Sequence, residues 1–381
     1  MKTTYLLLCL LGIGSVSGAG QTKQPQKIGD FIESTSYNEH RRNATRSLQY
    51  TPDGDDFVCI NGKNRFTRAL YGSHTAFRLE TSDRPVFAAY TKENPKHICF
   101  KLQTSGGTVA LDSTEHCESR YTAGRRSYSL SDPAFGGGSL SITTWALPDK
   151  EGAIWQFNAR NFKGSNPILL ASISEIRNSK LNRNGDMGAD PADSFEAPLQ
   201  PQQLQSCPAQ IDGTLYILLE NQELRTLTTA EGENLFKKAE AARSETASRI
   251  RIETPDPYFN TLGGTLAMAA DGIWDGEVWL HGAIGWRMPL SGWRAAYTGD
   301  VLGWHDRART HFNAYAASQV TEVPNTLPHP AQDSALHLAR SVKKWGTPQY
   351  SNGYICRNPH RNNQMHHYDM NLCYIDECYG I

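Results

Sequence analysis

The sequence predicts a multidomain protein of the β plus α class, in which an antiparallel β-sandwich is followed by a helical domain. The chain has 381 residues, a length at which roughly two or three domains are expected. Short apolar runs separated by turns dominate as far as residue 228, and helix-forming segments dominate beyond it. Hydrophobic residues make up 39% of the chain, which is enough for folded cores.

The candidate strands lie in residues 51–228. The segment FVCINGKNRFTRALYG holds two apolar runs around an Asn-Gly pair, which is typical of a hairpin. HICFKLQTSGGTVALDS predicts a second hairpin that bends at Gly-Gly, and SLSITTWALPDKEGAIWQFNAR a third that bends at Pro-Asp-Lys-Glu-Gly. PILLASISEI and TLYILLEN add two more strands. Many short strands between turns favour an antiparallel sandwich.

The pattern changes at Thr229. Residues 229–254 are rich in strong helix formers and lack proline, so they predict a helix that links two domains. Four further helical segments are predicted, beginning at Pro257 and lying within residues 298–319, 330–345 and 362–380. Loops rich in Gly, Pro or Asn separate them. Helices in series with such loops indicate an array of α-hairpins over residues 255–381.

The N-terminus is typical of an export signal. Lys2 precedes the apolar run YLLLCLLGIG, and small residues near Gly18–Gly20 offer a cleavage site, so residues 1–20 are predicted to be a signal peptide. The run is too short to span a membrane, and no other segment is long and apolar enough. Residues 21–50 are polar and predict an N-terminal arm. We therefore expect export to a periplasm or beyond the cell.

Charge argues against nucleic acid as a partner. The 38 Lys and Arg residues nearly balance the 39 Asp and Glu residues, whereas proteins that bind phosphate backbones normally carry a basic excess.

The stretch GIWDGEVWLHGAIGWRMPLSGWR, residues 272–294, holds half of the eight tryptophans and several charges. Sugars present flat apolar faces, on which indoles stack, and hydroxyl rims, which Asp, Arg and His bind. This composition predicts a carbohydrate-binding wall. The expected substrate-binding residues are Trp274, Trp279, His281, Trp286, Arg287, Trp293 and Arg294, with His305, Asp306 and Arg307 from the next helix. The alternatives are indoles that pad a domain contact and an Asp306 that forms a structural ion pair.

Glycoside hydrolysis normally uses two carboxylates. Asp275 and Glu277 lie inside the tryptophan-rich stretch, where burial can raise a pKa into the working range of a general acid. They are the predicted catalytic pair, although for Asp275 the role of a sugar-hydroxyl ligand is favoured over that of the acid. The other candidate carboxylates are Asp300, Asp306, Asp376 and Glu377.

No cofactor and no metal are expected. Histidines and cysteines gather in CRNPHRNNQMHHYDMNLC, but their spacing matches no standard zinc pattern, so hydrogen-bonding histidines are favoured. The polar residues 182–190 lack the glycine position and closing Glu of a calcium loop. Removal of a signal peptide containing Cys9 leaves an odd number of cysteines at scattered spacings, which defines no disulfide framework.

The motifs PDPYFNTLGGTLAMAADGIWDGEVWLHGAIGWRMPLSGWR and GWHDRARTHFNAYA, placed after a β domain and a linker helix, resemble the secreted six-hairpin glycosidases. The similarity is to a bacterial branch found in polysaccharide-degrading systems. It covers about residues 56–381 and is sharpest from Pro255 to Tyr315. It implies a supersandwich-like β domain over residues 51–228, followed by an (α/α)6 barrel.

The helical region is short for such a barrel, which has twelve helices. Residues 255–381 have room for about four helices of about fifteen residues each with their loops. We therefore expect only the first part of a barrel here, and a catalytic acid and base that can lie outside this chain. Incomplete closure should leave apolar faces bare, such as those bearing Leu336, Val342, Met370 and Leu372.

Three functions remain open. The first is an exported glycoside hydrolase-like protein acting on oligosaccharides from complex polysaccharides. The second is a carbohydrate binder without catalysis. The third is a polysaccharide lyase, which needs an anion clamp and a Tyr or His base; Arg287, Arg294, His281 and Tyr297 are candidates for these roles.

Overall fold

The computed structural model describes residues 50–63, 66–91, 95–164, 166–176, 203–282, 289, 295–319, 332–333, 338–339, 353, 355, 359 and 368–380. The chain divides into two compact units, Met1–Leu48 and Gln49–Ile381. The first unit, with the predicted signal peptide and most of the polar arm, lies outside the described residues. All that follows concerns the second unit.

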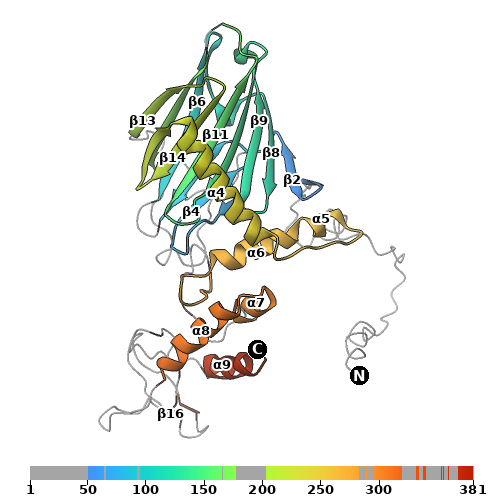
Figure 1. Ribbon diagram of the computed structural model, residues 1–381, viewed down its shortest axis with the longest axis vertical. Coiled ribbons are helices and arrows are strands. Elements are labelled where there is room, and N and C mark those ends of the chain that lie inside the picture. The colour runs from blue at the N-terminus through green and yellow to red at the C-terminus, as the bar shows by residue number, and fades with distance from the viewer. Residues whose placement is uncertain are drawn as a thin grey trace. The chain divides into compact units, whose positions relative to one another are not determined.

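The β region consists of two antiparallel sheets (Figure 1). Within the described residues, the eight-stranded sheet has the order β1 (Thr51–Asp53), β2 (Asp56–Ile60), β8 (His116–Thr122), β9 (Arg125–Ser131), β10 (Ser139–Ala146), β11 (Gly152–Arg160), β14 (Thr214–Glu220), β15 (Glu223–Leu227). The seven-stranded sheet has the order β13 (Gln203–Gln210), β12 (Ile168–Glu175), β6 (Lys96–Thr104), β5 (Val86–Tyr90), β4 (Arg78–Ser82), β3 (Phe66–Leu70), with β7 (Gly107–Ala110) paired to β6. Short 3₁₀ helices lie at Leu111–Ser113 and Pro133–Phe135.

The main core lies between the two sheets. Strand β10 buries Leu140, Ile142 and Ala146 in this core, as the period of two in a strand requires. The rings of Phe87, Phe100 and Trp155 pack edge to face with centroids 5.4–5.8 Å apart, the arrangement that aromatic pairs favour. The antiparallel sandwich predicted for residues 51–228 is therefore present.

Two of the three predicted hairpins are confirmed. Strands β6 and β7 pair around the Gly-Gly bend, and β10 pairs with β11 around Pro-Asp-Lys-Glu-Gly. The predicted strands PILLASISEI and TLYILLEN are β12 and β14.

The hairpin predicted at the Asn-Gly pair is wrong, because β2 and β3 lie in different sheets. Asn61 adopts the left-handed φ of 51° that such a turn would use. Its backbone N–H, however, donates to the Cys117 carbonyl (2.8 Å), and its side-chain oxygen accepts from the Cys117 N–H (2.9 Å). Asn61 therefore continues the pairing beside β8, and the chain then crosses to the other sheet.

The predicted linker helix is α4 (Thr229–Ala247), which ends earlier than the predicted residue 254. It begins with a capping box, in which the Thr228 hydroxyl accepts from the Glu231 N–H and the Glu231 carboxylate accepts from the Thr228 N–H. Leu235, Phe236 and Ala239 pack on residues of β10, β11 and β14 that point away from the main core. Helix α4 therefore covers the outer face of the eight-stranded sheet (Figure 1).

The later helices are α5 (Pro257–Asn260), α6 (Leu262–Gly272), α7 (Ala295–Val301), α8 (His305–Ala317) and α9 (Tyr368–Gly380). The single helix predicted within residues 298–319 is thus two helices, broken at Gly303, whose φ of 74° a right-handed helix does not allow.

The helix predicted within residues 330–345 is also wrong for the part that is described. Gln332–Asp333 (β16) pairs antiparallel with Leu338–Ala339 (β17), so backbone pairing with another segment replaces local helix formation. An (α/α)6 barrel is not shown by the described helices. No helix in the described part of the chain is both long enough and apolar enough to cross a membrane.

Apolar side chains are exposed on the last helices. Leu372, Ile375 and Tyr379 of α9 are 69%, 64% and 93% exposed, and Val301 of α7 is 82% exposed. Leu372 is one of the four residues expected on bare faces. Leu336 and Val342 lie outside the described residues, as does the Met370 side chain.

Candidate functional site

The described part of the predicted carbohydrate-binding wall is a hydrophobic core. Trp274 and Trp279 are 4% and 1% exposed, and the centroids of their rings lie 4.7 Å apart. Their backbones form an isolated antiparallel bridge, and both indoles pack with Leu302 and Trp304. This packing holds the loop after α6 against α8, so neither indole offers an open face to a sugar. Trp286, Arg287, Trp293 and Arg294 lie outside the described residues.

The predicted catalytic pair lies in the turn between the two buried tryptophans. The exposed Asp275 accepts hydrogen bonds at Oδ1 from the N–H groups of Glu277 (3.0 Å) and Val278 (2.7 Å), so its carboxylate closes the turn. Glu277 and the nearby His281 are half-buried. No described contact joins the two carboxylates as an acid and base pair.

The residues predicted at the start of α8 separate into two groups. His305 is paired through Nδ1 with Asp300 Oδ1 at 2.9 Å, and Asp306 is paired with Arg309 at 3.2 Å. The Asp306 side chain is 96% exposed, so this pair is the structural ion pair that the sequence left open, and such exposed pairs contribute little to stability. Arg307 points the other way, into a cleft.

Tyr297, the candidate lyase base, donates its hydroxyl to Asp376 Oδ2 at 2.7 Å. This hydrogen bond, together with burial, raises the pKa of Tyr297 to about 12. A proton held in this way is poorly suited to removal at neutral pH.

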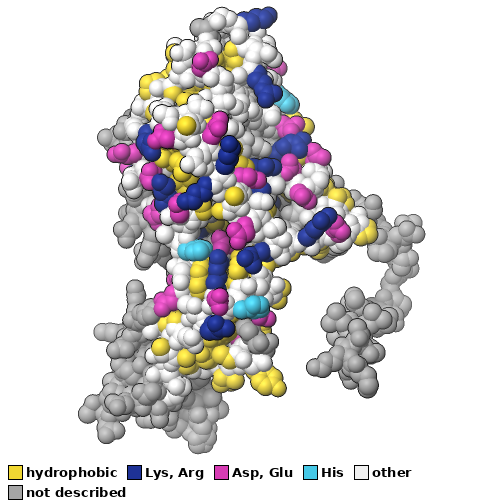
Figure 2. Space-filling view, in the orientation of Figure 1, with side chains coloured by type: hydrophobic (Ala, Val, Ile, Leu, Met, Phe, Trp, Pro, Cys, Tyr) yellow, Lys and Arg dark blue, Asp and Glu magenta, His cyan; other side chains and the backbone are white. Residues whose placement is uncertain are grey.

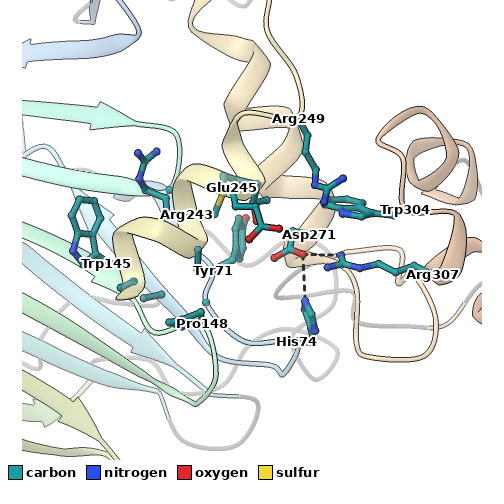
Figure 3. Close-up of a pocket in the computed structure, with 17 residues that line it drawn as sticks. Tyr71, His74, Trp145, Pro148, Arg243, Glu245, Arg249, Asp271, Trp304 and Arg307 are labelled. Carbon is teal, nitrogen blue, oxygen red and sulfur yellow. Dashed lines mark hydrogen bonds and ion pairs between the residues drawn. The ribbon is translucent and has the colours of Figure 1, made fainter. Parts of the chain in front are cut away.

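The cleft lies where the sandwich meets α4, α6 and the start of α8, and its volume is about 200 Å³ (Figure 3). Its sandwich residues follow β3, lie at the end of β10 or, in the case of Gly124, form the turn between β8 and β9, and its helical residues come from three separate segments. The polar and aromatic lining consists of Tyr71, His74, Trp145, Arg243, Glu245, Arg249, Asp271, Trp304 and Arg307. In Figure 2, charged side chains of both signs and histidine side chains gather between the β-sandwich and the region of α8.

Asp271, on the last turn of α6, is the centre of the cleft's hydrogen bonding. Its Oδ1 accepts from Arg307 Nη1 at 2.7 Å and contacts His74 Nε2 at 3.3 Å, as the dashed lines in Figure 3 show. Burial by itself raises the pKa of Asp271, but the hydrogen bonds from His74 and Arg307 outweigh it and hold this pKa below its usual value. Asp271 is therefore an ionised acceptor that joins the sandwich to α6 and α8.

Two guanidinium groups lie against the indole of Trp304. The Arg307 guanidinium carbon is 4.2 Å from the ring centroid and that of Arg249 is 5.1 Å from it. Trp145, at the other end of the cleft, likewise has Arg125 and Arg243 at 5.6 Å and 5.8 Å. Both indoles are nearly buried. The cleft therefore presents charged donors rather than open aromatic faces.

Replacing Asp271 by Asn should lower the free energy of unfolding by about 1–2 kcal/mol, because the Arg307 guanidinium loses its ionised acceptor in a partly buried place. Urea unfolding followed by tryptophan fluorescence would measure the change. Asp306→Asn is the matched control, since its carboxylate is exposed, and it should stay within about 0.5 kcal/mol of the parent. Equal losses in the two variants would show that the Asp271 contacts contribute nothing.

Arg307 is the one residue of the cleft lining that is also among the predicted substrate-binding residues. Arg243, Glu245 and Arg249 belong to the segment that was interpreted as a linker, and His74 and Asp271 carried no motif. One signal was available in Trp145, which is out of phase with the inward Leu140 and Ile142 of β10. A large aromatic residue on the outer face of a strand indicates that another element covers that face.

The part of the chain that is described holds no group of three or more His, Cys, Asp or Glu side chains placed to bind a metal ion. The described cysteines, Cys59, Cys99, Cys117, Cys207, Cys373 and Cys378, form no disulfide with one another. The other side chains of the histidine- and cysteine-rich segment, Cys356, His360, His366, His367 and Asp369, are not described.

Three comparisons relate the chain to known proteins. The family model for a domain of unknown function, DUF4450, matches residues 95–249, from the strand β6 region to Arg249. No curated protein matches. Among solved structures, the chain is similar to a bacterial glucoamylase in complex with acarbose, with 10% sequence identity and a TM-score of 0.37. That match covers 68% of this chain and 53% of the glucoamylase chain, so this chain spans about half the length of that relative.

Proposed function

We propose that the chain is an exported, glycoside hydrolase-like protein that binds carbohydrate in the cleft around Asp271. The observation that carries this proposal is the lining of the cleft, which combines ionised acceptors and fixed cationic donors from elements far apart in the sequence. Export is part of the proposal and rests on the signal-like residues 1–20.

The cleft chemistry suits a ligand rich in hydroxyl groups. A sugar hydroxyl both donates and accepts, so it needs carboxylate acceptors and N–H donors at close range. Glu245 and Asp271 supply the acceptors, and the arginines and His74 supply the donors. The cleft volume of about 200 Å³ is below the range of about 300–1,000 Å³ that is common for drug-sized ligands. We therefore infer that one or two sugar units enter the cleft.

Hydrolysis is the second candidate function, because two carboxylates line this one cleft. Asp271 is held ionised by Arg307 and His74, as a base or an electrostatic stabiliser must be. Glu245, on the exposed side of α4, would then supply the proton to the leaving group. The originally predicted pair, Asp275 and Glu277, stays a proposal for any substrate that reaches the turn after α6.

The test is glycan binding with a cleft variant. Glu245→Ala should weaken the binding of every saccharide that the parent recognises by about five- to tenfold, because the variant lacks a charged acceptor for hydroxyls. Isothermal titration calorimetry against plant, fungal and bacterial oligosaccharides would give the affinities. Glu233→Ala is the control, since Glu233 lies on the same helix, is 51% exposed and does not line the cleft.

The outcomes separate the candidates. Binding that the two variants weaken equally, or no binding of any glycan by the parent, would contradict the cleft as a carbohydrate site. Release of reducing sugar by the parent but not by Glu245→Gln would favour hydrolysis over binding alone. Release of an unsaturated, ultraviolet-absorbing product would instead identify a lyase.

A further inference from the structure

We propose that the end of this cleft near Trp304 is an anion subsite, built from Arg249 and Arg307, that selects saccharides carrying a negatively charged group. The proposal rests on the proposed function, since it specifies the class of sugar that the cleft takes. It is carried by the placement of the two guanidinium groups and by the N–H donors that they leave unused.

Arg249 is held in place without a carboxylate partner. Its Nη1 donates to the carbonyl oxygen of Leu302 at 2.9 Å, and its guanidinium carbon lies 5.1 Å from the Trp304 ring centroid. Across the described ranges, no Asp or Glu lies within ion-pair distance of it. A guanidinium has five N–H donors, so most of those of Arg249 are left for a ligand. Its backbone carbonyl and indole contacts fix the side chain before any ligand arrives, which lowers the entropic cost of binding.

Arg307 reaches the same indole from α8 (Figure 3). Its Nη1 donates to Asp271 at 2.7 Å, and its side chain remains 24% exposed. Asp271 thus neutralises much of the Arg307 charge but uses only one of its donor atoms. Arg249 and Arg307 therefore both lie against the Trp304 indole, and each keeps N–H groups that no acceptor among the described residues occupies.

The other charges in the cleft restrict where the anion can lie. Arg243 is paired through Nε and Nη2 with both carboxylate oxygens of Glu240, at 2.7 Å each, and also donates to the Ala123 carbonyl. It is therefore already committed to protein acceptors. Among the described residues no cation is paired with Glu245, and its carboxylate would repel an anion placed next to it. The charged group of the sugar should accordingly lie near Arg249, with hydroxyl groups toward Glu245.

The chemistry of a guanidinium favours oxyanions as ligands. Its parallel N–H groups match the two oxygens of a carboxylate, and they also bind the oxygens of a sulfate ester. Uronic acids supply the first group and sulfated sugars the second. Both would present a single negative charge on a sugar ring small enough for this cleft.

The experiment compares sugars that differ only in charge. The probes are oligogalacturonate and oligoglucuronate, their fully methyl-esterified forms of the same length, and sulfated and unsulfated galacto-oligosaccharides. The parent should bind at least one charged form about tenfold or more tightly than its neutral counterpart, and Arg249→Gln should lower this ratio of affinities to about twofold or less. Arg251→Gln is the matched control, since Arg251 is 83% exposed, pairs with Glu253 and does not line the cleft.

Preference for either charged sugar that depends on Arg249 supports the subsite, and the tighter of the two anions identifies the group. Equal affinity for charged and neutral forms would overturn the anion subsite and leave the proposed function standing. A preference that Arg249→Gln and Arg251→Gln reduce equally would overturn it as well, because the effect would then come from overall charge. Failure of every sugar to bind would remove both proposals.

Discussion

Replacing Arg78 by methionine is expected to lower the free energy of unfolding by about 3–5 kcal/mol. This is the usual cost of breaking a buried interaction of a charged group by removing one of its partners. Arg78 lies on β4 and is fully buried. Its Nη1 donates to the carbonyls of Thr75 (2.9 Å) and Phe77, and its Nη2 donates to the carbonyl of Gly272 at the end of α6. Its guanidinium also lies 4.6 Å from the Tyr71 ring centroid.

The size of the effect follows from what the substitution leaves behind. Methionine fills much of the same volume but donates nothing, so the buried carbonyl groups lose their partner. Glu80 lies two residues further along β4, on the same face of the strand. The positive charge of Arg78 lowers the pKa of Glu80 and so offsets part of the effect of burial on that carboxyl group. The variant would leave that carboxyl group without its compensating cation.

Chemical unfolding monitored by far-ultraviolet circular dichroism would give the two free energies. Arg120→Met is the matched control, because Arg120 carries three carboxylate partners but is 34% exposed, and surface networks of this kind contribute about 1 kcal/mol or less. A loss below about 1 kcal/mol for Arg78→Met, or one no larger than for Arg120→Met, would show that the junction between β4 and α6 does not depend on this side chain.

The same junction positions the cleft. Asp271 contacts His74, which precedes β4. The next residue, Gly272, accepts a hydrogen bond from Arg78 of β4, which lies four residues after His74. A Cβ atom at Gly272 would be 2.6 Å from Cγ of Tyr71, so only glycine allows this approach of α6 to the sandwich. The donors and acceptors of the cleft therefore depend on a close backbone contact.

The strands were predictable because their signal is local. In β10 and β12 the alternation of buried and exposed residues follows largely from the apolar pattern of each strand. Strands β8 and β9 were not predicted, and their buried positions include the polar Ser119 and the charged Arg126. The partner of a strand is not local information. Asn61 after β2 has the positive φ of a hairpin-turn residue, but Gly62 does not, and the chain continues into the other sheet once Asn61 has completed its hydrogen bonds with Cys117 of β8.

The site could not be predicted in the same way. A tryptophan beside charges is compatible with both a sugar platform and a core that needs ion pairs at its edge, and Trp274 and Trp279 are the second case. The cleft itself joins residues near positions 71, 145, 245, 271 and 304. No spacing rule relates segments so far apart, so charged residues such as Arg243 on α4 and Arg249 just after it look like the solvated face of a linker until the fold is known.

Glu80 is expected to make the protein less stable as the pH rises. Burial raises the pKa of its carboxyl group to about 7, against 4.5 for the free group, although the charge of Arg78 lowers it in part. Between these two values the folded state keeps a proton that the unfolded state has lost. The stability that Glu80 contributes is therefore fully present below about pH 4.5 and is lost as the pH rises through about 7, a change of about 3 kcal/mol.

Glu80→Gln tests this directly, because the neutral amide resembles the protonated acid and does not titrate. The variant should be within about 1 kcal/mol of the parent near pH 5 and should be about 3 kcal/mol more stable near pH 8. His97 and His311, whose pKa values burial lowers to about 4, change stability in the opposite direction below pH 6.5, and burial raises the pKa of Glu377 to about 8. These groups are the same in both proteins, so they cancel in the difference between variant and parent. Urea unfolding at the two pH values would measure that difference, with the surface variant Glu233→Gln run in parallel as the control. If the difference in the free energy of unfolding between Glu80→Gln and the parent does not widen from pH 5 to pH 8, Glu80 ionises in the folded protein as freely as in water.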